Sequence, residues 1–205
     1  LVVADLAKPH SASVPPLAAE ALTCARNIDI LVNNAGRFYD VPFTDMTVDR
    51  FESTFQLNVA AGYFLTQAFA LHWIPRNVSG RVLFTGSING RLAEADSTAY
   101  DISKGAVEMM VKTLCVALAP KGIRVNGMAP GLVRTSQTTW IEDQPGMARW
   151  MEMHTPNGEV PNPDVCGPAA TYLVSDDARH VHGQMLLVDG GMSAWQQPPM
   201  PHTGS

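Results

Sequence analysis

Short apolar runs alternate along this chain with longer segments of helical spacing, and this alternation constrains the fold more than any other feature. The runs have the length and composition of buried parallel strands. They are Leu1–Ala4, Ile28–Val32, Arg81–Thr85, Ile123–Met128 and Met185–Val188. The pattern predicts an α/β fold in which a parallel sheet carries helices on both faces.

Helix signals occupy the longer segments between these runs. Residues that favour helix starts or ends, such as threonine, asparagine, proline and glycine, stand at the segment boundaries. The first predicted helix runs from Pro15-Pro16 through Arg26, and the second runs from a cap at Thr47 to Trp73. The third runs from Thr98 to Ala119 and ends before Gly122, and the fourth begins after a cap at Asn162, with Pro163 as its first residue. The second and third are apolar over more than one stripe, which is typical of helices buried on two sides.

Two regions depart from the alternation. Residues 135–161 have weak periodicity, and we predict a partly helical lid over a substrate pocket. An ordinary packing excursion or an oligomer contact is the alternative for this stretch. Residues 196–205 include three prolines and no periodicity, so we expect a flexible C-terminal tail.

The composition fits one packed unit and argues against two classes of partner. Of the 205 residues, 46% are hydrophobic, which is enough for one buried core. A net charge of -5 without a basic run gives no surface suited to nucleic acid or to an anionic membrane. No apolar stretch is long enough to cross a bilayer. We therefore expect a protein that binds neither nucleic acid nor membrane.

Cysteines and histidines form no metal-binding or disulfide pattern. Cys24, Cys115 and Cys166 are scattered among apolar neighbours in predicted helices, so we expect free, buried thiols in the reducing cytoplasm. A secretory signal pattern is lacking. For His180 and His182 we favour a turn or interface role over a metal site. We predict no bound metal.

Tyr100 and Lys104 are four residues apart in a predicted helix, so their side chains project from the same face. A phenol has a reference pKa of about 10, and a nearby ammonium lowers that pKa by favouring the phenolate. The pair can therefore act as a general acid and base near neutral pH. Taken alone, the spacing is also that of an ordinary surface pair.

Ser87 gives this pair a context. It directly follows the predicted strand Arg81–Thr85, at the carboxyl edge of the sheet, where open α/β folds bind ligands. A serine in such a place can also serve the turn itself. We predict that Ser87, Tyr100 and Lys104 converge if residues 90–98 fold back over the sheet edge.

These segments together resemble the classical short-chain dehydrogenases/reductases. The resemblance covers the chain from Asp5 to Gly191. In the family's order and at its spacings, the matching elements are residues 29–36 with the letters NNAG, Asn58, Ser87, the YxxxK of Tyr100 and Lys104, residues 124–135, and residues 183–191. The resemblance implies a Rossmann-type doubly wound parallel sheet.

The resemblance also implies catalytic roles. Tyr100 would be the general acid and base, and Lys104 would bind the nicotinamide ribose and lower the pKa of Tyr100. Ser87 would hydrogen-bond the reacting oxygen. Asn58 would hold a water that links Lys104 to solvent.

Cofactor contacts carry over from the family in the same way. The implied residues are Asp5, Leu6, Asn33, Ala35, Gly36, Tyr100, Lys104, Pro130, Gly131, Val133 and Thr135. Asp5 would meet the adenine amino group, and the backbone of Val133 would meet the carboxamide. Gly36 and Gly131 would let the main chain approach the ligand closely. A structural role is favoured for Asn33 and for Asn126.

The sequence departs from the family in one respect, because no TGxxxGxG string occurs in the 205 residues. That turn wraps the cofactor diphosphate at a helix N-terminus. We expect residues 1–195 to be a truncated dinucleotide-binding catalytic domain that lacks the first βαβα segment, since the chain opens in mid-strand without methionine. A naturally shortened chain is the alternative. The missing second strand normally distinguishes NAD from NADP, so the cofactor is NAD or NADP. We expect the chain alone to be inactive or prone to aggregation.

The implied function is hydride transfer between nicotinamide and a small-molecule carbonyl or secondary alcohol. A catalytically silent cofactor-binding or scaffold protein is one alternative, and an epimerase or dehydratase is another. Trp140, Trp150 and the methionines of the predicted lid indicate an apolar, adaptable pocket. By resemblance we expect a homodimer or homotetramer.

Overall fold

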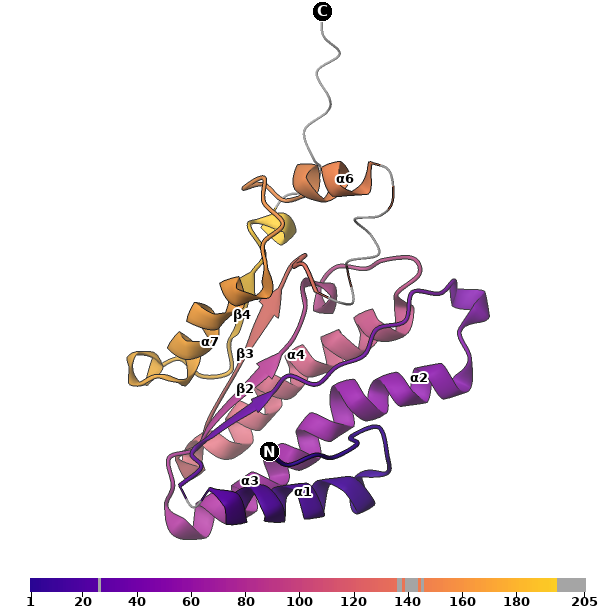
Figure 1. Cartoon of the computed structure of the whole chain (residues 1–205). Helices are drawn as coiled ribbons and strands as arrows, with labels where there is room; N and C mark the ends of the chain where they lie inside the picture. The colour runs from indigo at the N-terminus through magenta and orange to yellow at the C-terminus, as the bar shows by residue number, and fades with distance from the viewer. Residues whose placement is uncertain (26, 136–137, 139–143, 145, 195–205) are drawn as a thin grey trace, which may run out of the picture.

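The computed structural model describes residues 1–25, 27–135, 138, 144 and 146–194, and contains one four-stranded parallel sheet (Figure 1). The strands are β1 (Ile30–Asn33), β2 (Arg81–Thr85), β3 (Arg124–Pro130) and β4 (Met185–Val188), and they lie in the order β1-β2-β3-β4. All neighbours are parallel, so their carboxyl ends meet at one edge. The predicted bounds of β2 and β4 are confirmed, whereas β1 and β3 begin and end later than expected.

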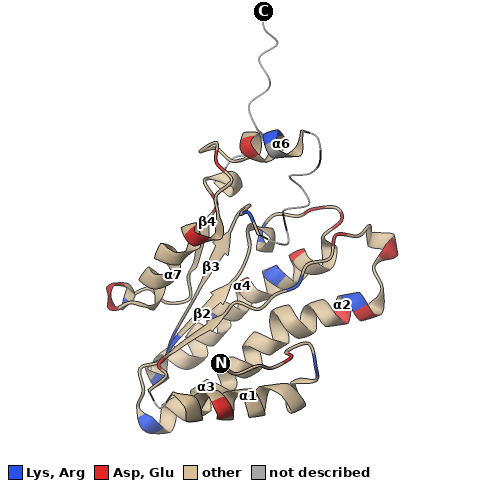
Figure 2. Cartoon of the chain, in the orientation of Figure 1, with Lys and Arg blue, Asp and Glu red and all other residues tan. Residues whose placement is uncertain are grey.

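Helices cover both faces of the sheet, as predicted. The α-helices are α1 (His10–Cys24), α2 (Val48–Phe55), α3 (Ala61–Trp73), α4 (Thr98–Leu118), α6 (Met147–His154) and α7 (Cys166–Val174). In Figure 1, α3 and α4 lie on one face with α1 packed on α3, and α7 lies on the other. Figure 2 shows most of the sheet and of α3 without charged residues.

The two faces of the sheet bury two separate apolar clusters. On the side of α3 and α4, Val82, Phe84 and Val125 pack with helix residues that include the fully buried Trp73. On the side of α7, Leu83 packs with Met128 and Leu173. Successive side chains of a strand point to opposite faces, so β2 supplies both clusters.

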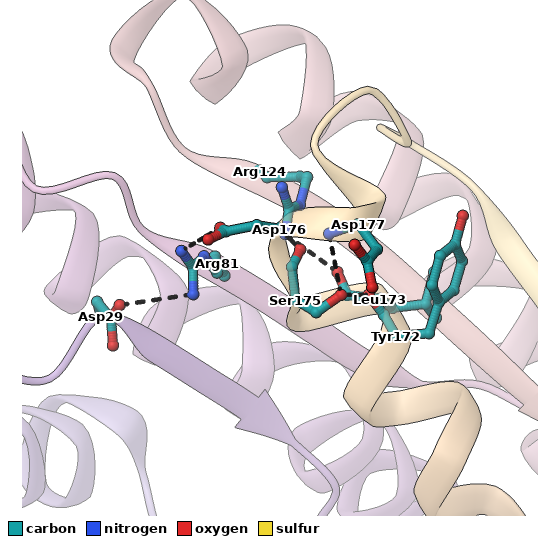
Figure 3. A network of polar contacts seen from close by, with 8 residues as sticks. All are labelled: Asp29, Arg81, Arg124, Tyr172, Leu173, Ser175, Asp176 and Asp177. Carbon is teal, nitrogen blue, oxygen red and sulfur yellow. Dashed lines mark hydrogen bonds and ion pairs between the residues drawn. The ribbon is translucent and has the colours of Figure 1, made fainter.

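The amino ends of the strands are held by arginines (Figure 3). Arg81 forms ion pairs with Asp176, at 2.7 Å, and with Asp29, at 3.7 Å. Arg124 donates from Nη2 to the carbonyl of Ser175, at 2.5 Å, and to that of Leu173, at 3.5 Å. These contacts fasten the C-terminal end of α7 to the edge of the sheet opposite to the one where ligands bind.

The predicted strand Leu1–Ala4 is wrong. The segment is extended coil, with Leu1 and Val3 exposed. A strand is stabilised by hydrogen bonds to a neighbour, and no described residue pairs with positions 1–4. Consequently β1 is an edge strand, with Ile30 and Val32 partly exposed.

Helix α1 begins earlier than predicted, and Pro15 and Pro16 lie inside it. Prolines leave the carbonyls four residues before them without a helical donor. Those carbonyls belong to Ser11 and Ala12, which are exposed, as are both prolines. Water can therefore serve them, and the helix continues to Cys24; the predicted end, Arg26, lies outside the described residues.

The predicted helix from Thr47 to Trp73 contains an unforeseen π-helical turn. Thr47 caps α2 as expected, accepting from the backbone N–H of Arg50 at 3.3 Å. Between α2 and α3 lies the π turn η2 (Gln56–Ala60). Such turns insert a residue into helical winding and are frequent at functional sites.

Other helix ends agree in part with expectation. Gly122 ends α4 and its 3₁₀ extension η5 (Ala119–Lys121) with a left-handed backbone, φ 76°. Pro163 opens the 3₁₀ turn η6 (Pro163–Val165) before α7, but the Asn162 side chain makes no capping hydrogen bond. The three cysteines are free, but Cys24 is exposed rather than buried, and Cys115 and Cys166 are only partly buried.

Candidate active site

The carboxyl ends of β2 and β3 open onto a cavity of about 600 Å³. Its floor follows β2, because the backbone N–H of Gly86 donates to the carbonyl of Met128 at 2.7 Å and extends the pairing beyond Thr85. Ser87 comes next, and its hydroxyl accepts from the backbone N–H of Asn89 at 3.2 Å. This bond opens the 3₁₀ turn η4 (Ile88–Gly90) and fixes Ser87 at the cavity wall.

The segment after Ser87 folds back onto α4. Asp101, in the first turn of α4, holds it with both carboxylate oxygens. It accepts from the side-chain amide of Asn89 at 2.9 Å and from the backbone N–H of Glu94 at 2.8 Å. Ser87, Tyr100 and Lys104 consequently line the same cavity.

Lys104 is buried, with 6% of its surface exposed. Its Nζ donates to the carbonyl of Thr85 at 2.8 Å and lies 5.5 Å from the centroid of the Tyr100 ring. Burial in this apolar setting lowers the pKa of Lys104 to about 8. The ammonium form therefore still predominates at neutral pH.

Tyr100 differs from expectation, because its pKa is raised rather than lowered. Burial of the phenol is the largest cause, and the charges of Asp101 and Glu94 add to it. The hydroxyl of Ser87 opposes this shift by hydrogen bonding to the phenol. At neutral pH, Tyr100 holds its proton in the structure as it stands.

Asn58 lies in the π turn η2 and is buried. Its Oδ1 accepts from the backbone N–H of Arg37 at 2.7 Å, and its Nδ2 donates to the Arg37 carbonyl at 2.8 Å. Nδ2 also donates at 3.0 Å to the hydroxyl of Ser103, which donates in turn to the carbonyl of Tyr100 at 2.7 Å. Asn58 thereby joins the loop after β1 to the helix that carries Tyr100 and Lys104.

The predicted cofactor residues form two groups according to the cavity that they line, and one residue lines neither cavity. Gly36, Pro130, Gly131, Val133 and Thr135 line the catalytic cavity with Tyr100 and Lys104. Leu6, Asn33 and Ala35 line a separate cleft of about 70 Å³. Asp5 lines neither, since it is exposed and its carboxylate accepts from the backbone N–H of Ala7 at 3.0 Å.

The two predicted glycines have different steric reasons. A Cβ on Gly36 would lie 3.7 Å from Nζ of Lys104, in ordinary contact at the cavity wall. A Cβ on Gly131 would lie 2.8 Å from Cβ of Asp189. Gly131 is thus required by the packing of the chain itself, whatever lies in the cavity.

Asn33 and Asn126 differ in how completely their side chains are bonded. Asn126 donates to the carbonyl of Val181 at 2.6 Å and accepts from the backbone N–H of Gln184 at 3.0 Å, the structural role that we expected. Asn33 donates to Thr66 at 3.2 Å, but its buried Oδ1 has no partner among the described residues. An acceptor left in this way suits a ligand with a hydrogen-bond donor.

The described residues fit a nicotinamide dinucleotide at its two ends. An ammonium carries three N–H donors, and Lys104 uses one on Thr85 within the described chain, so two remain for ribose hydroxyls. The unpartnered Oδ1 of Asn33 suits an adenosine donor in the small cleft. For the diphosphate between them, the sequence contains no TGxxxGxG turn.

Several residues that line the cavity were not predicted. They are Arg37, Phe38, Asn89, Glu94, Thr138, Cys166 and Met192, among others. The Phe38 ring meets the Tyr100 ring edge-on at 5.3 Å between centroids. The position of Arg37 and Phe38 directly after the NNAG segment at the end of β1 was a usable signal, because residues at this edge face the ligand.

The predicted lid is described only in part. Trp140 lies outside the described residues. Trp150 is half-exposed and stacks on His154, and Met151, also on α6, is buried. Figure 1 places α6 beyond the carboxyl ends of β3 and β4, which is the side where the cavity opens. The predicted tail, residues 196–205, lies wholly outside the described part.

No group of three or more potential metal ligands occurs in residues 1–194 apart from the undescribed positions. Within the same part, no helix combines the length and hydrophobicity needed to span a bilayer.

The known proteins that resemble this chain include reductases and dehydrogenases. The sequence profile of a family described as Enoyl-(Acyl carrier protein) reductase matches residues 2–193. The 5-keto-D-gluconate 5-reductase of Escherichia coli is 35% identical over 165 residues, which cover 80% of this chain and 65% of that protein. The cyclopentanol dehydrogenase of a Comamonas species is 36% identical over 167 residues, covering 82% of this chain and 66% of that protein.

A solved structure has the same fold. The gluconate 5-dehydrogenase of Burkholderia cenocepacia, in complex with NADP and tartrate, superposes with a TM-score of 0.88 at 31% identity. The match covers 94% of this chain and 74% of that one. The chain therefore spans slightly less than two thirds of the two curated relatives and about three quarters of this solved structure.

Proposed function

This chain belongs to the short-chain dehydrogenase/reductase family, and we propose that it catalyses hydride transfer between a nicotinamide dinucleotide, NAD or NADP, and a carbonyl or secondary alcohol. The observation that carries the proposal is the convergence of Ser87, Tyr100 and Lys104 on one cavity at the carboxyl edge of the sheet. A nicotinamide bound there would supply the hydride acceptor or donor.

Tyr100 is the proton-transfer group in this proposal. Its phenol is protonated at neutral pH because burial raises its pKa. In the reductive direction it gives this proton to the oxygen that becomes the alcohol. In the oxidative direction it must first lose the proton, so alkaline pH favours its action as a base.

Lys104 and Ser87 support that transfer from two sides. The ammonium of Lys104 lies beside the Tyr100 ring, and its positive charge favours the phenolate form during the reaction. Its two remaining N–H groups would hold the nicotinamide ribose. The hydroxyl of Ser87 would hydrogen-bond the reacting oxygen, where negative charge develops during reduction.

Asn58 positions the site in this proposal. Both amide hydrogens on its Nδ2 are engaged, by the Arg37 carbonyl and the Ser103 hydroxyl. Its Oδ1 accepts one bond and keeps one lone pair for the water of the expected proton relay. The remaining cofactor residues would line the path of the dinucleotide, except Asp5, whose exposure does not support the adenine contact.

Assembly and location are proposed on separate observations. Ile102, Met109 and Val116 recur every seven residues along α4 and are all exposed. Such an apolar stripe supports a homodimer or homotetramer, and Met109→Lys should reduce the mass measured by light scattering. The unpaired cysteines support a reducing, cytoplasmic setting.

The test is the substitution Tyr100→Phe in the protein as its gene encodes it. Turnover of a panel of sugars, small ketones and cyclic alcohols should fall by roughly 10² to 10⁴, while nucleotide affinity stays within about twofold. The control is Tyr63→Phe, which removes the hydroxyl of a half-exposed tyrosine on α3. Unchanged turnover in Tyr100→Phe would show that the proton passes through another group.

A further inference from the structure

A second hollow, of about 480 Å³, adjoins the catalytic cavity. Its lining includes residues 36–41, Arg50 from the first turn of α2, and Leu57. Gly36, Arg37 and Phe38 line both spaces, so Arg37 stands at the boundary between them. A ligand reacting at Tyr100 can therefore extend into the hollow.

Two guanidinium groups lie close to one aromatic ring in this hollow. The Cζ of Arg37 lies 5.7 Å from the Tyr39 ring centroid, and the Cζ of Arg50 lies 5.8 Å from it. A guanidinium over a ring face keeps its N–H edge free to donate hydrogen bonds. Within the described residues, neither arginine forms an ion pair or a side-chain hydrogen bond.

The backbone of Arg37 is held firmly, which limits where its side chain can reach. Asn58 bonds both the N–H and the carbonyl of Arg37, at 2.7 and 2.8 Å. The same Asn58 is joined through Ser103 to the carbonyl of Tyr100. The base of the arginine side chain is thus fixed relative to the proton-transfer group, as specific recognition of a substrate requires.

The charges around the hollow favour an anion. Asp40 is the one acidic residue in its lining, and it is exposed. Partial burial and the negative charge of the neighbouring Asp96 raise the pKa of Asp40. Counting only the lining, two cations face one exposed acid, and Asp96 stands outside the lining, so the lining itself carries an excess of positive charge. Planar guanidinium groups match carboxylate and phosphate oxygens with paired hydrogen bonds.

We propose that the hollow formed by Arg37, Tyr39 and Arg50 binds a carboxylate or phosphate carried by the substrate while the reacting carbon lies beside Tyr100. This inference rests on the proposed function and names its substrate class as polar acids with a hydroxyl or carbonyl at a distance from the anionic group. It differs from the apolar pocket expected from the sequence. Arg37 is the main anion ligand, and Arg50 assists from the outer side.

The test compares two ligands that differ in one group. Gluconate and sorbitol share a six-carbon polyol chain, and only gluconate carries a carboxylate. Their affinities are measured by calorimetry in the Tyr100→Phe background, with saturating NADP⁺ or NAD⁺, so that turnover is suppressed during the measurement. We expect gluconate to bind at least tenfold more tightly than sorbitol. Equal affinities would overturn the proposal.

Substitutions locate the effect. Arg37→Gln should abolish the preference for gluconate and leave sorbitol binding unchanged, which also reports that the cavity is intact. Arg50→Gln should reduce the preference about threefold. Arg76→Gln removes the same charge from the far end of α3, where that guanidinium donates to the His72 carbonyl, and should change nothing. A preference that survives Arg37→Gln would overturn the assignment.

A further experiment decides whether Arg37 binds an anionic group of the substrate or the phosphates of the cofactor. Nucleotide affinity is measured directly for the parent protein and for Arg37→Gln. A change of less than threefold supports a substrate site. A loss of tenfold or more would assign Arg37 to the cofactor phosphates and overturn the proposal. Because binding is the readout, a failure of the proposed hydride transfer would appear only in the turnover assays.

Discussion

A buried cation lies at each end of the strands, one at the amino edge and one at the carboxyl edge of the sheet. The two cations differ in how many hydrogen-bond partners the protein gives them. At the amino edge, Arg124 is 8% exposed and donates to two carbonyls at the C-terminal end of α7, where the helix dipole is negative (Figure 3). At the carboxyl edge, Lys104 is 6% exposed, has one carbonyl partner and faces a cavity. Burial lowers the pKa of both.

This difference distinguishes a cation that supports the fold, Arg124, from a cation that is available for chemistry, Lys104. The carbonyls around Arg124 and the ion pairs of Arg81 use the terminal guanidinium nitrogens within the protein, although the buried Nε of Arg124 has no partner among the described residues. Lys104 keeps donors free, and this incomplete satisfaction carries a free-energy cost that the rest of the fold must offset. Under our proposal, the free donors and the charge of Lys104 bind and activate a ligand, which explains why the protein tolerates this cost.

The largest expected effect is on Lys104→Met. Turnover should fall by about 10³, because the charge beside Tyr100 and the ribose donors are lost. The free energy of unfolding at pH 7 should stay equal or rise, by up to about 3 kcal/mol, because an ammonium with a depressed pKa is no longer buried. Kinetics and urea unfolding check the two halves. A destabilised variant would mean that Lys104 supports the fold as Arg124 does.

Arg124→Met should show the reverse pattern. Removal of the guanidinium leaves the carbonyls of Leu173 and Ser175 without their donor, and the free energy of unfolding should fall by about 2–4 kcal/mol. Turnover per folded molecule should remain within about twofold. A selective loss of turnover in a stable variant would contradict a purely structural role for this edge.

A pH titration sharpens the comparison without substitution. Between about pH 8 and pH 10 the unfolded chain holds the Lys104 proton while the folded one releases it, so stability should rise with pH in this window, by about 2 kcal/mol. Above pH 10 the raised pKa of Tyr100 acts in the opposite direction, because the unfolded phenol ionises first. The rise should be absent from Lys104→Met.

The smallest effect is expected for Asp176→Ala. Its ion pair with Arg81 is short, 2.7 Å, but the carboxylate side chain is 87% exposed. Exposed pairs contribute at most about 1 kcal/mol, and high salt should reduce the contribution further. Unfolding in low and high salt measures it. A loss above about 2 kcal/mol would show that this edge depends on the ion pair as much as on Arg124.

Sequence patterns were sufficient where a structural signal is local. The bounds of β2 and β4 were predicted correctly, and the spacing of Tyr100 and Lys104 placed both on one face of α4. We predicted that residues 90–98 fold back over the sheet edge, but we did not predict the two hydrogen bonds that Asp101 accepts from this region. Such contacts depend on segments that meet only in three dimensions.

The errors have the same origin. Leu1–Ala4 has a strand composition, but a strand also needs a neighbour, which composition does not report. The pKa of Tyr100 was expected to fall because of Lys104, whereas burial, a property of the folded chain, dominates and raises it. Arg37 has no periodicity to mark it, and we missed it because we did not use the one signal available, its place directly after the NNAG segment.

The π turn at Gln56–Ala60 makes the gene unusually sensitive to a one-codon deletion at this point. A π turn accommodates one residue more than the regular winding, so the loss of a single codon here would leave a straighter and locally more regular helix. The same deletion would rotate everything on one side of it by about 100° and swing the Asn58 amide away from Arg37 and Ser103. Selection at this site therefore acts on the number of residues as well as on their identity.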